Sequence, residues 1–278
     1  MRPGILTVLL ATSLALPLST SVATPSDSFS LGTPPSQERL YRNAIQHNPQ
    51  NLDNYLQLAD LLLQQNRPEE AIAVYQQAIH QHPQQADLHY DLAVTLTEQG
   101  DFEGALQSYQ KALNLDPTHG DALYNMGLVS YAMGNIDQGM AYFRRMIQLY
   151  PNHPDSYIWL GKGYYNQNQL PQAIQSWQTA IKLDPQAVYA YSSLGDALAQ
   201  QGKLDQAVLY YRQALAQPDQ EGIPISAHAL AHYGLGSVLQ RQGQWEAAIT
   251  EYEKALELAP EFSQAQENLL KAQGHSSL

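Results

Sequence analysis

Small and apolar residues recur along the chain with a period of 34 residues. In each repeat, position 7 is Leu or Met and position 8 is Ala or Gly, whereas positions 20 and 27 are Ala, Gly or Met and position 24 is always aromatic. Positions 4, 7, 8 and 11 form one stripe of a helix with 3.6 residues per turn, and positions 20, 24 and 27 form a stripe on a second helix. The pattern predicts a pair of antiparallel helices in each repeat.

Six such repeats follow one another, and each pair is bounded by residues that stop helices. The repeats span 52–85, 86–119, 120–153, 154–187, 188–221 and 229–262. Most end at a proline, which lacks an amide hydrogen and restricts the residue before it. Between the two helices of each pair lies a Gly or Asn suited to a left-handed C-cap. These cap residues are Asn66, Gly100, Gly134, Asn168, Gly202 and Gly243.

The ends of the array carry incomplete elements. Residues 36–48 are predicted to form the second helix of a leading half-repeat. A closing helix is expected from Ser263 to about Gln273, with Leu269 and Leu270 facing the array, and 275–278 form a tail. Residues 222–228, inserted before the last repeat, are interpreted as a loop or as an extension of the next helix.

These residues resemble the tetratricopeptide repeat family, whose pattern combines Leu-Gly, aromatic, Ala and Pro positions at a spacing of 34 residues. The resemblance covers roughly residues 36–274 and implies an all-α, right-handed superhelical solenoid of six helix-turn-helix repeats. A fold of this kind has a groove in place of an enclosed pocket, and members of the family commonly assist the assembly of larger complexes.

Composition and charge narrow the classes of function. The net charge of −12 and the absence of a basic stripe exclude nucleic acid as the expected partner. No catalytic motif, phosphate loop or zinc signature appears in the sequence. We therefore expect that the protein is not an enzyme and that it binds no cofactor, metal or small-molecule substrate. The pairs His80 and His82, and His228 and His232, supply two ligands each, which is fewer than zinc requires.

The N-terminal residues do not follow the repeat. Met1-Arg2, a largely apolar run from Ile5 to Leu16, and the small residues ending at Ala23 are typical of a secretory signal peptide over residues 1–23. A retained membrane anchor is the alternative. Residues 24–35 are predicted to be a flexible lead. Export to a periplasm or a comparable lumen is the expected localisation.

The groove is predicted to be lined by positions 2, 5, 6, 9, 12 and 13 of the first helices. The candidate partner-binding residues are Asp87, Tyr90, Asp121, Tyr124, Asn125, Leu128, Tyr131, Asp155, Ile158, Trp159, Lys162, Tyr165 and Asp196. The position-2 aspartates lie in the first turn of a helix, where they favour its dipole, and an acidic rim that steers a basic peptide is a compatible second role. The aromatic residues are typical anchors of protein recognition, although Tyr131 and Tyr165 could instead pack against the next repeat.

The predicted function is therefore an exported, non-enzymatic scaffold. It would bind a protein or peptide segment, basic or aromatic in character, and assist assembly of an envelope or membrane-associated complex. The alternatives are a self-associating structural protein and a targeting subunit for an enzyme on another chain. Chaperone-tail binding of the kind known in the family is not expected, because only Asn125 and Lys162 match its clamp.

Overall fold

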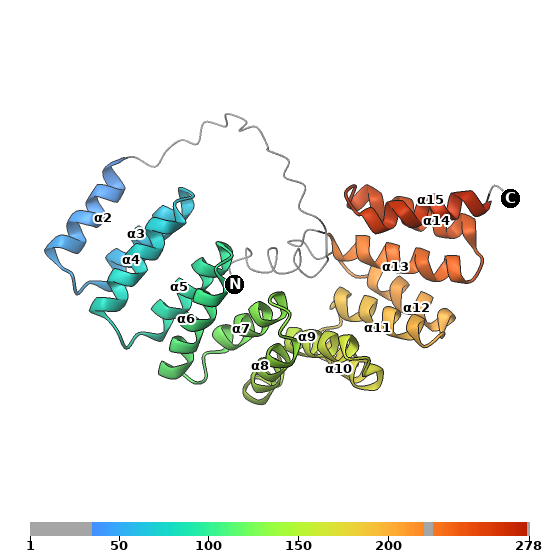
Figure 1. Ribbon diagram of the computed structural model, residues 1–278, viewed down its shortest axis with the longest axis horizontal. Coiled ribbons are helices and arrows are strands. Elements are labelled where there is room, and N and C mark those ends of the chain that lie inside the picture. The colour runs from blue at the N-terminus through green and yellow to red at the C-terminus, as the bar shows by residue number, and fades with distance from the viewer. Residues whose placement is uncertain (1–34, 220–224, 277–278) are drawn as a thin grey trace. The chain divides into compact units, whose positions relative to one another are not determined.

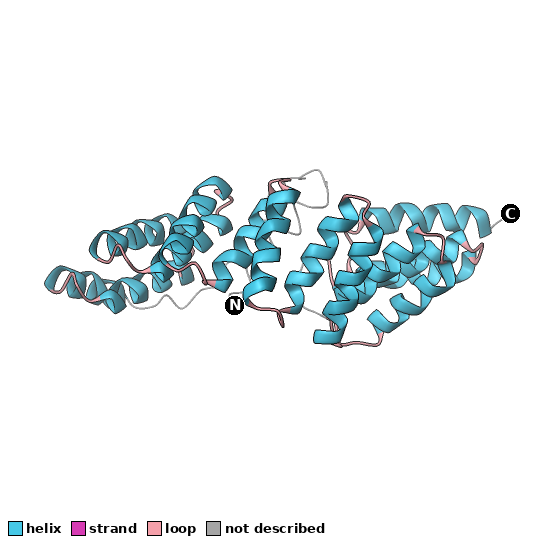
Figure 2. Cartoon of the chain, turned by 90° about the horizontal axis from the view of Figure 1, so that it is seen from below, coloured by secondary structure: helices cyan, strands magenta, loops and turns pink. Residues whose placement is uncertain are grey.

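The structure, a computed structural model, describes residues 35–219 and 225–276. In these two ranges it contains fourteen α-helices and no strand, which confirms the predicted all-α repeat fold (Figures 1 and 2). The helices are α2 (Pro35–His47), α3 (Leu52–Gln64), α4 (Pro68–Gln81), α5 (Ala86–Glu98), α6 (Phe102–Leu115), α7 (Gly120–Ala132), α8 (Ile136–Leu149), α9 (Pro154–Asn166), α10 (Leu170–Leu183), α11 (Val188–Gln200), α12 (Leu204–Leu215), α13 (Ala227–Arg241), α14 (Trp245–Leu258) and α15 (Ser263–Ser276).

The predicted signal peptide, residues 1–23, and nearly all of the lead, 24–35, lie outside the described residues. Among the helices listed above, none combines the length and the apolar character that a membrane crossing needs.

The chain divides into two compact units between Met133 and Gly134. The N-terminal unit holds α2 to α7, and the C-terminal unit holds α8 to α15. The division falls inside the predicted repeat 120–153, between its two helices. Within each unit, every helix contacts the next one along the chain.

In the C-terminal unit, the first helices of successive repeats also contact one another. Helix α11 touches both α9 and α13, and α13 also touches α15. These four helices, α9, α11, α13 and α15, are called the inner row below. Their partners α10, α12 and α14 are called the outer helices.

The six predicted C-caps are confirmed by the backbone. Asn66 and Asn168 have φ of 57° and 58°, and Gly100, Gly134, Gly202 and Gly243 have φ between 75° and 79°. Glycine adopts this left-handed conformation easily because it has no β-carbon, and asparagine tolerates it better than most other residues. The repeating sequence therefore fixes the turn within each helix pair.

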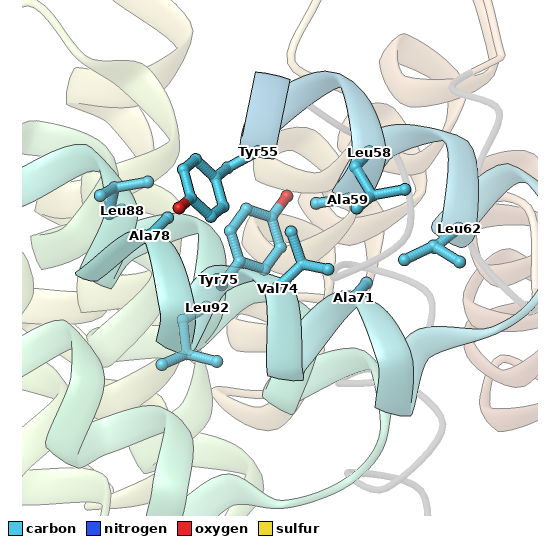
Figure 3. Packing of buried hydrophobic residues seen from close by; sticks show 10 residues of the cluster. All are labelled: Tyr55, Leu58, Ala59, Leu62, Ala71, Val74, Tyr75, Ala78, Leu88 and Leu92. Carbon is cyan, nitrogen blue, oxygen red and sulfur yellow. The ribbon is translucent and has the colours of Figure 1, made fainter. Parts of the chain in front are cut away.

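The aromatic residue at position 24 is the centre of each helix pair. Figure 3 shows this packing around Tyr75 of α4, which lies among small residues such as Ala59 and Ala71. The equivalent residues of the other repeats are buried as well: Tyr109, Phe143, Trp177, Tyr211 and Tyr252. Small side chains at positions 8 and 20 leave the room that these rings fill.

Two details of the C-terminal end differ from the prediction or decide between alternatives. Leu269 packs against the core of the C-terminal unit, but Leu270 is 69% exposed, so the prediction that both leucines face the array is wrong for Leu270. Consecutive side chains on a helix point about 100° apart, so two neighbours cannot both face the same narrow groove.

The insertion before the last repeat ends in helix. Helix α13 begins at Ala227, so residues 227 and 228 are a helical extension of the last repeat.

Candidate functional site

The predicted groove residues of the N-terminal unit lie on α5 and α7, and several of them are buried. Tyr124, Asn125 and Leu128 are only 8%, 7% and 2% exposed. Tyr131 is half-buried, whereas Asp121 is exposed. Tyr124, Asn125 and Leu128 therefore have little surface to offer a partner, contrary to the expectation that they line an open groove.

Tyr90 of α5 is held within a polar cluster. Its hydroxyl accepts a hydrogen bond from Asn125 Nδ2 at 3.3 Å, and its ring lies 4.8 Å from the His119 ring. His119 Nε2 lies 3.3 Å from Asp87 Oδ1, and the Asp87 carboxylate remains largely exposed to water. These contacts link α5 to the start of α7 and leave Asp87 at the surface.

The helix caps are made by residues that the sequence analysis did not single out. His119 Nδ1 accepts the amide hydrogen of Ala122, and His153 Nδ1 accepts that of Ser156, both at 3.3 Å. Asp121 and Asp155 follow these histidines and lie in the first turn of their helices, where the helix dipole favours a carboxylate. Burial raises the pKa of Asp155 above its usual range. The histidine that ends a repeat was a detectable signal for these caps, because it occurs just before the next first helix.

In the C-terminal unit, the predicted residues on α9 form an aromatic and cationic group. The Trp159 ring stacks against Phe143 at 6.3 Å, and Lys162 Nζ lies 4.9 Å from the centre of the Trp159 ring. Burial lowers the pKa of Lys162. The carbonyl of Ile158 accepts a hydrogen bond from Trp177 Nε1 at 3.0 Å. Ile158 thus anchors an outer-helix tryptophan, while Trp159 and Lys162 are half-buried together.

Tyr211 reaches from the outer helix α12 to Asp196 on the inner row. Its hydroxyl donates a hydrogen bond to Asp196 Oδ1 at 2.5 Å. The ring passes between two glycines, because a β-carbon on Gly195 would lie 2.8 Å from it and one on Gly234 would lie 2.4 Å from it. The small residues of α11 and α13 therefore create the slot through which the hydroxyl reaches the carboxylate.

Tyr165 of α9 completes this part of the inner row. Its ring lies 5.8 Å from the Trp177 ring, and it is half-buried. Burial raises the pKa of Tyr165, and the negative charge of Asp196 raises it further. Tyr165, Asp196 and Tyr211 thus bring residues of three different helices into one electrostatic group.

Asp196 is the one carboxylate of this three-residue group, and its pKa is raised. The Asp196 side chain is exposed at the surface, although the helices on either side of it displace part of its surrounding water. This desolvation raises the pKa of Asp196 to about 6, and the hydrogen bond from Tyr211 acts in the opposite direction. A carboxylate with such a pKa changes charge just below neutral pH.

The pH dependence of Asp196 gives a first prediction. We expect its pKa to be about 6, compared with about 3.9 for an unperturbed aspartate. The Tyr211→Phe substitution should raise the pKa further, because it removes the hydrogen bond that favours the charged form. Carboxyl-carbon NMR of the protein across pH 3 to pH 8 measures both values.

The sign of the linked stability follows from the same shift. Because folding raises the pKa of Asp196, this group contributes stability below about pH 4, and that contribution is lost as the pH rises through about 6. Asp196→Asn should therefore gain stability relative to wild type between pH 4 and pH 7. A wild-type pKa near 4 would contradict the expectation.

Within residues 35–219 and 225–276, no group of three His, Cys, Asp or Glu residues is placed to hold a metal. The histidine pair on α13 has other contacts. His228 Nε2 lies 2.9 Å from the carbonyl of Gln217, and His232 Nδ1 lies 2.6 Å from Glu251 Oε2. His232 and Lys254 both contact Glu251, which ties α13 to α14.

Two family profiles match the chain. The profile described as the cilia and flagella-associated protein 70 C-terminal domain matches residues 28–230, and the tetratricopeptide repeat profile matches residues 229–262. A search of curated proteins found no match.

Many solved structures resemble the chain. MamA is 26% identical with a TM-score of 0.54, and the match covers 57% of this chain and 93% of MamA. YrrB, described as a tetratricopeptide repeat protein with an unusual peptide-binding site, is 25% identical with a TM-score of 0.52, covering 69% of this chain and 96% of YrrB. Pseudomonas aeruginosa pilF, at 20% identity, shares the fold with a TM-score of 0.63, covering 84% of this chain and 99% of pilF.

Proposed function

Because the chain belongs to the family of the cilia and flagella-associated protein 70 C-terminal domain, whose members are built from tetratricopeptide repeats, we propose that it is a non-enzymatic scaffold that binds a segment of another protein. The observation that carries the proposal is the group of aromatic and charged side chains on the inner row of the C-terminal unit. Rigid aromatic residues beside charged groups are frequent anchors in protein interfaces.

The N-terminal part of the inner row supplies the aromatic anchors. Trp159 and Tyr165 are half-buried, so each ring is fixed by its neighbours and still has surface to offer. A ring that is already held in place loses little conformational entropy when it binds. The peptide-binding site described for YrrB supports a peptide or an extended protein segment as the partner.

The proposed site of action is outside the cytoplasm. Residues 1–23 have the charge, apolar run and small residues of a secretory signal. In an envelope or periplasm, the scaffold would assist assembly of a membrane-associated complex. Fractionation of the source cells followed by intact-mass measurement tests this: a protein that begins near residue 24 supports export, and a full-length protein in the membrane fraction supports a retained anchor.

The binding role predicts that Trp159→Ala combined with Tyr165→Ala abolishes capture of the partner from native extract. The reason is the loss of two aromatic anchors on the inner row, with an expected loss of at least 2 kcal/mol, or roughly thirtyfold in affinity. Affinity capture followed by mass spectrometry measures the retained proteins.

A matched control is available on the outer helices. Leu209 of α12 and Leu258 of α14 are 55% and 47% exposed. Replacing both by Ala removes a similar number of exposed apolar groups away from the inner row, and capture should be unchanged. Equal loss of partner from both double variants, with helical circular dichroism preserved, would remove the inner row from the interface.

Self-association is a second candidate function, and exposed leucines on the terminal helices favour it. Leu40 of α2 is 64% exposed and Leu270 of α15 is 69% exposed. Exposed apolar residues on an end helix of a repeat array are surfaces that another copy can cover. Sedimentation analysis decides this: a defined oligomer that is lost in Leu270→Glu supports self-association, and a monomer at high concentration rules it out.

A further inference from the structure

We propose that Ser192, Asp196 and Tyr211, together with the ring of Tyr165, form a subsite for one basic side chain, Arg or Lys, of the bound segment. This set of four residues is called the Asp196 subsite below. The inference rests on the proposed binding function and specifies the chemistry of the partner.

The first observation is that the Asp196 carboxylate has no cationic partner within the described parts of the chain. No ion pair joins it to the basic residues of the helices around α11, which are Lys162, Lys182, Arg212, His228, His232 and Arg241. Lys162 lies over the Trp159 ring, and Arg241 donates to the carbonyl of Ala199 at 2.8 Å. A carboxylate accepts about four hydrogen bonds. Asp196 therefore has acceptor capacity left after the bond from Tyr211.

The second observation is the unpaired hydroxyl of Ser192. Ser192 lies one helical turn before Asp196 on the same face of α11. It is only 8% exposed, and its Oγ atom has no hydrogen-bond partner. Two other buried helical serines satisfy their hydroxyls locally: Ser130 donates to the Met126 carbonyl at 2.7 Å, and Ser176 donates to the Gln172 carbonyl at 2.9 Å. A buried hydroxyl without a partner is costly unless a ligand or water pairs with it.

The third observation is the composition of the walls. Tyr165 of α9 and Tyr233 of α13 both interact electrostatically with Tyr211, and Asp196 interacts in the same way with Tyr165. The Trp177 ring of α10 lies 5.8 Å from the Tyr165 ring. These side chains carry aromatic faces and no carboxylate. A guanidinium or ammonium group can contact a carboxylate and an aromatic face at once, and Arg does so with two parallel hydrogen bonds. One negative charge among aromatic walls therefore suits a single cation.

A pH dependence of binding follows, because the subsite attracts a cation only when Asp196 is ionised. With the pKa of Asp196 at about 6, affinity for the basic side chain should fall by about tenfold between pH 7.5 and pH 5. The tyrosines of the subsite stay neutral over this range, because burial raises the pKa values of Tyr165 and Tyr211.

The test uses two synthetic peptide libraries that differ at one position. Both contain random dodecapeptides, with Arg fixed at the centre of one and its neutral analogue citrulline fixed at the centre of the other. The immobilised full chain is offered each library at pH 7.5 and at pH 5, and the retained amounts are compared. Asp196→Asn keeps an acceptor for Tyr211, and Glu253→Gln, at an exposed position of α14, removes the same charge elsewhere.

We expect the wild type and Glu253→Gln to retain the Arg library about tenfold more than the citrulline library at pH 7.5, and to lose this preference at pH 5. Asp196→Asn should show no preference at either pH, with unchanged helical circular dichroism. Equal retention of both libraries by the wild type, or a preference that survives in Asp196→Asn, overturns the Asp196 subsite while leaving segment binding intact. Retention of neither library also overturns it, and the capture experiment from native extract then decides the proposed function separately.

Discussion

Trp177→Ala is expected to lower the free energy of unfolding of the C-terminal unit by about 3–5 kcal/mol. Trp177 is 2% exposed and is the largest fully buried side chain. It packs with Ala173, Ala180 and Leu194 across α10 and α11. Alanine would leave a cavity that the surrounding helices cannot fill without losing their own contacts.

The same substitution removes a hydrogen bond and a support for the binding surface. Trp177 Nε1 donates to the carbonyl of Ile158 at 3.0 Å, and its ring lies against Tyr165. We therefore expect Tyr165 to lose its fixed position, so that capture of the partner weakens together with stability. Urea unfolding followed by circular dichroism measures the loss of stability.

Trp245→Ala is the matched control, because it removes the same side chain from a half-buried position in the same unit. Trp245 begins α14, where its ring stacks on His275 at 4.5 Å. Its loss should cost less than half as much as that of Trp177, because fewer atoms lose contacts. Comparable losses from the two substitutions would show that Trp177 is not the packing centre that the structure gives it.

Gly161→Ala is expected to lower the free energy of unfolding by about 1–3 kcal/mol, because it overpacks the core. A β-carbon at Gly161 would lie 2.5 Å from Trp177 Nε1 and 2.7 Å from Cδ1 of the same ring. The ring is buried and hydrogen-bonded, so it cannot move away cheaply. In an exposed helix the same substitution is favourable, since alanine is the better helix former by about 1 kcal/mol.

Gly274→Ala provides that comparison within the chain. Gly274 lies in α15, is exposed, and has no neighbouring atom within 4 Å of an added β-carbon. The Gly274→Ala substitution should stabilise the chain slightly or leave its stability unchanged in the same urea experiment.

A second test is the double variant Gly161→Ala with Trp177→Tyr, which copies the Ala and Tyr pairing of the first two repeats. The double variant should lose less than the sum of its single changes, and strict additivity would contradict the steric explanation.

The repeat pattern predicted the helices because each one depends on local signals. Small residues, an aromatic ring and a left-handed cap recur at fixed positions, and Asn168 and Gly202 adopt the expected backbone. The sequence could not show that the chain divides between Met133 and Gly134, since the cap at Gly134 matches that of other repeats. Neighbouring leucines such as Leu269 and Leu270 were ambiguous for a similar reason, because periodicity does not say how wide the buried stripe is.

Prediction of the candidate site was less complete, because exposure depends on packing between repeats. Position 5 holds Tyr90, Tyr124 and Ser192, yet Tyr90 is half-buried while Tyr124 and Ser192 are buried. Position 9 drew attention to Asp196, but the hydrogen bond from Tyr211 required knowledge of the slot between Gly195 and Gly234. The sequence pattern indicated an aromatic and acidic surface, but the contacts of each side chain could be identified only in the structure.

The central claim is that the inner row of the C-terminal unit binds a segment of another protein. Site-specific photo-crosslinking tests it most directly, with p-benzoylphenylalanine placed at Tyr165 on the inner row or at Leu209 on an outer helix. We predict that, on irradiation in native extract, the chain labelled at position 165 forms a defined adduct with one partner protein and the chain labelled at position 209 does not. An adduct at 209 with none at 165 would contradict the claim.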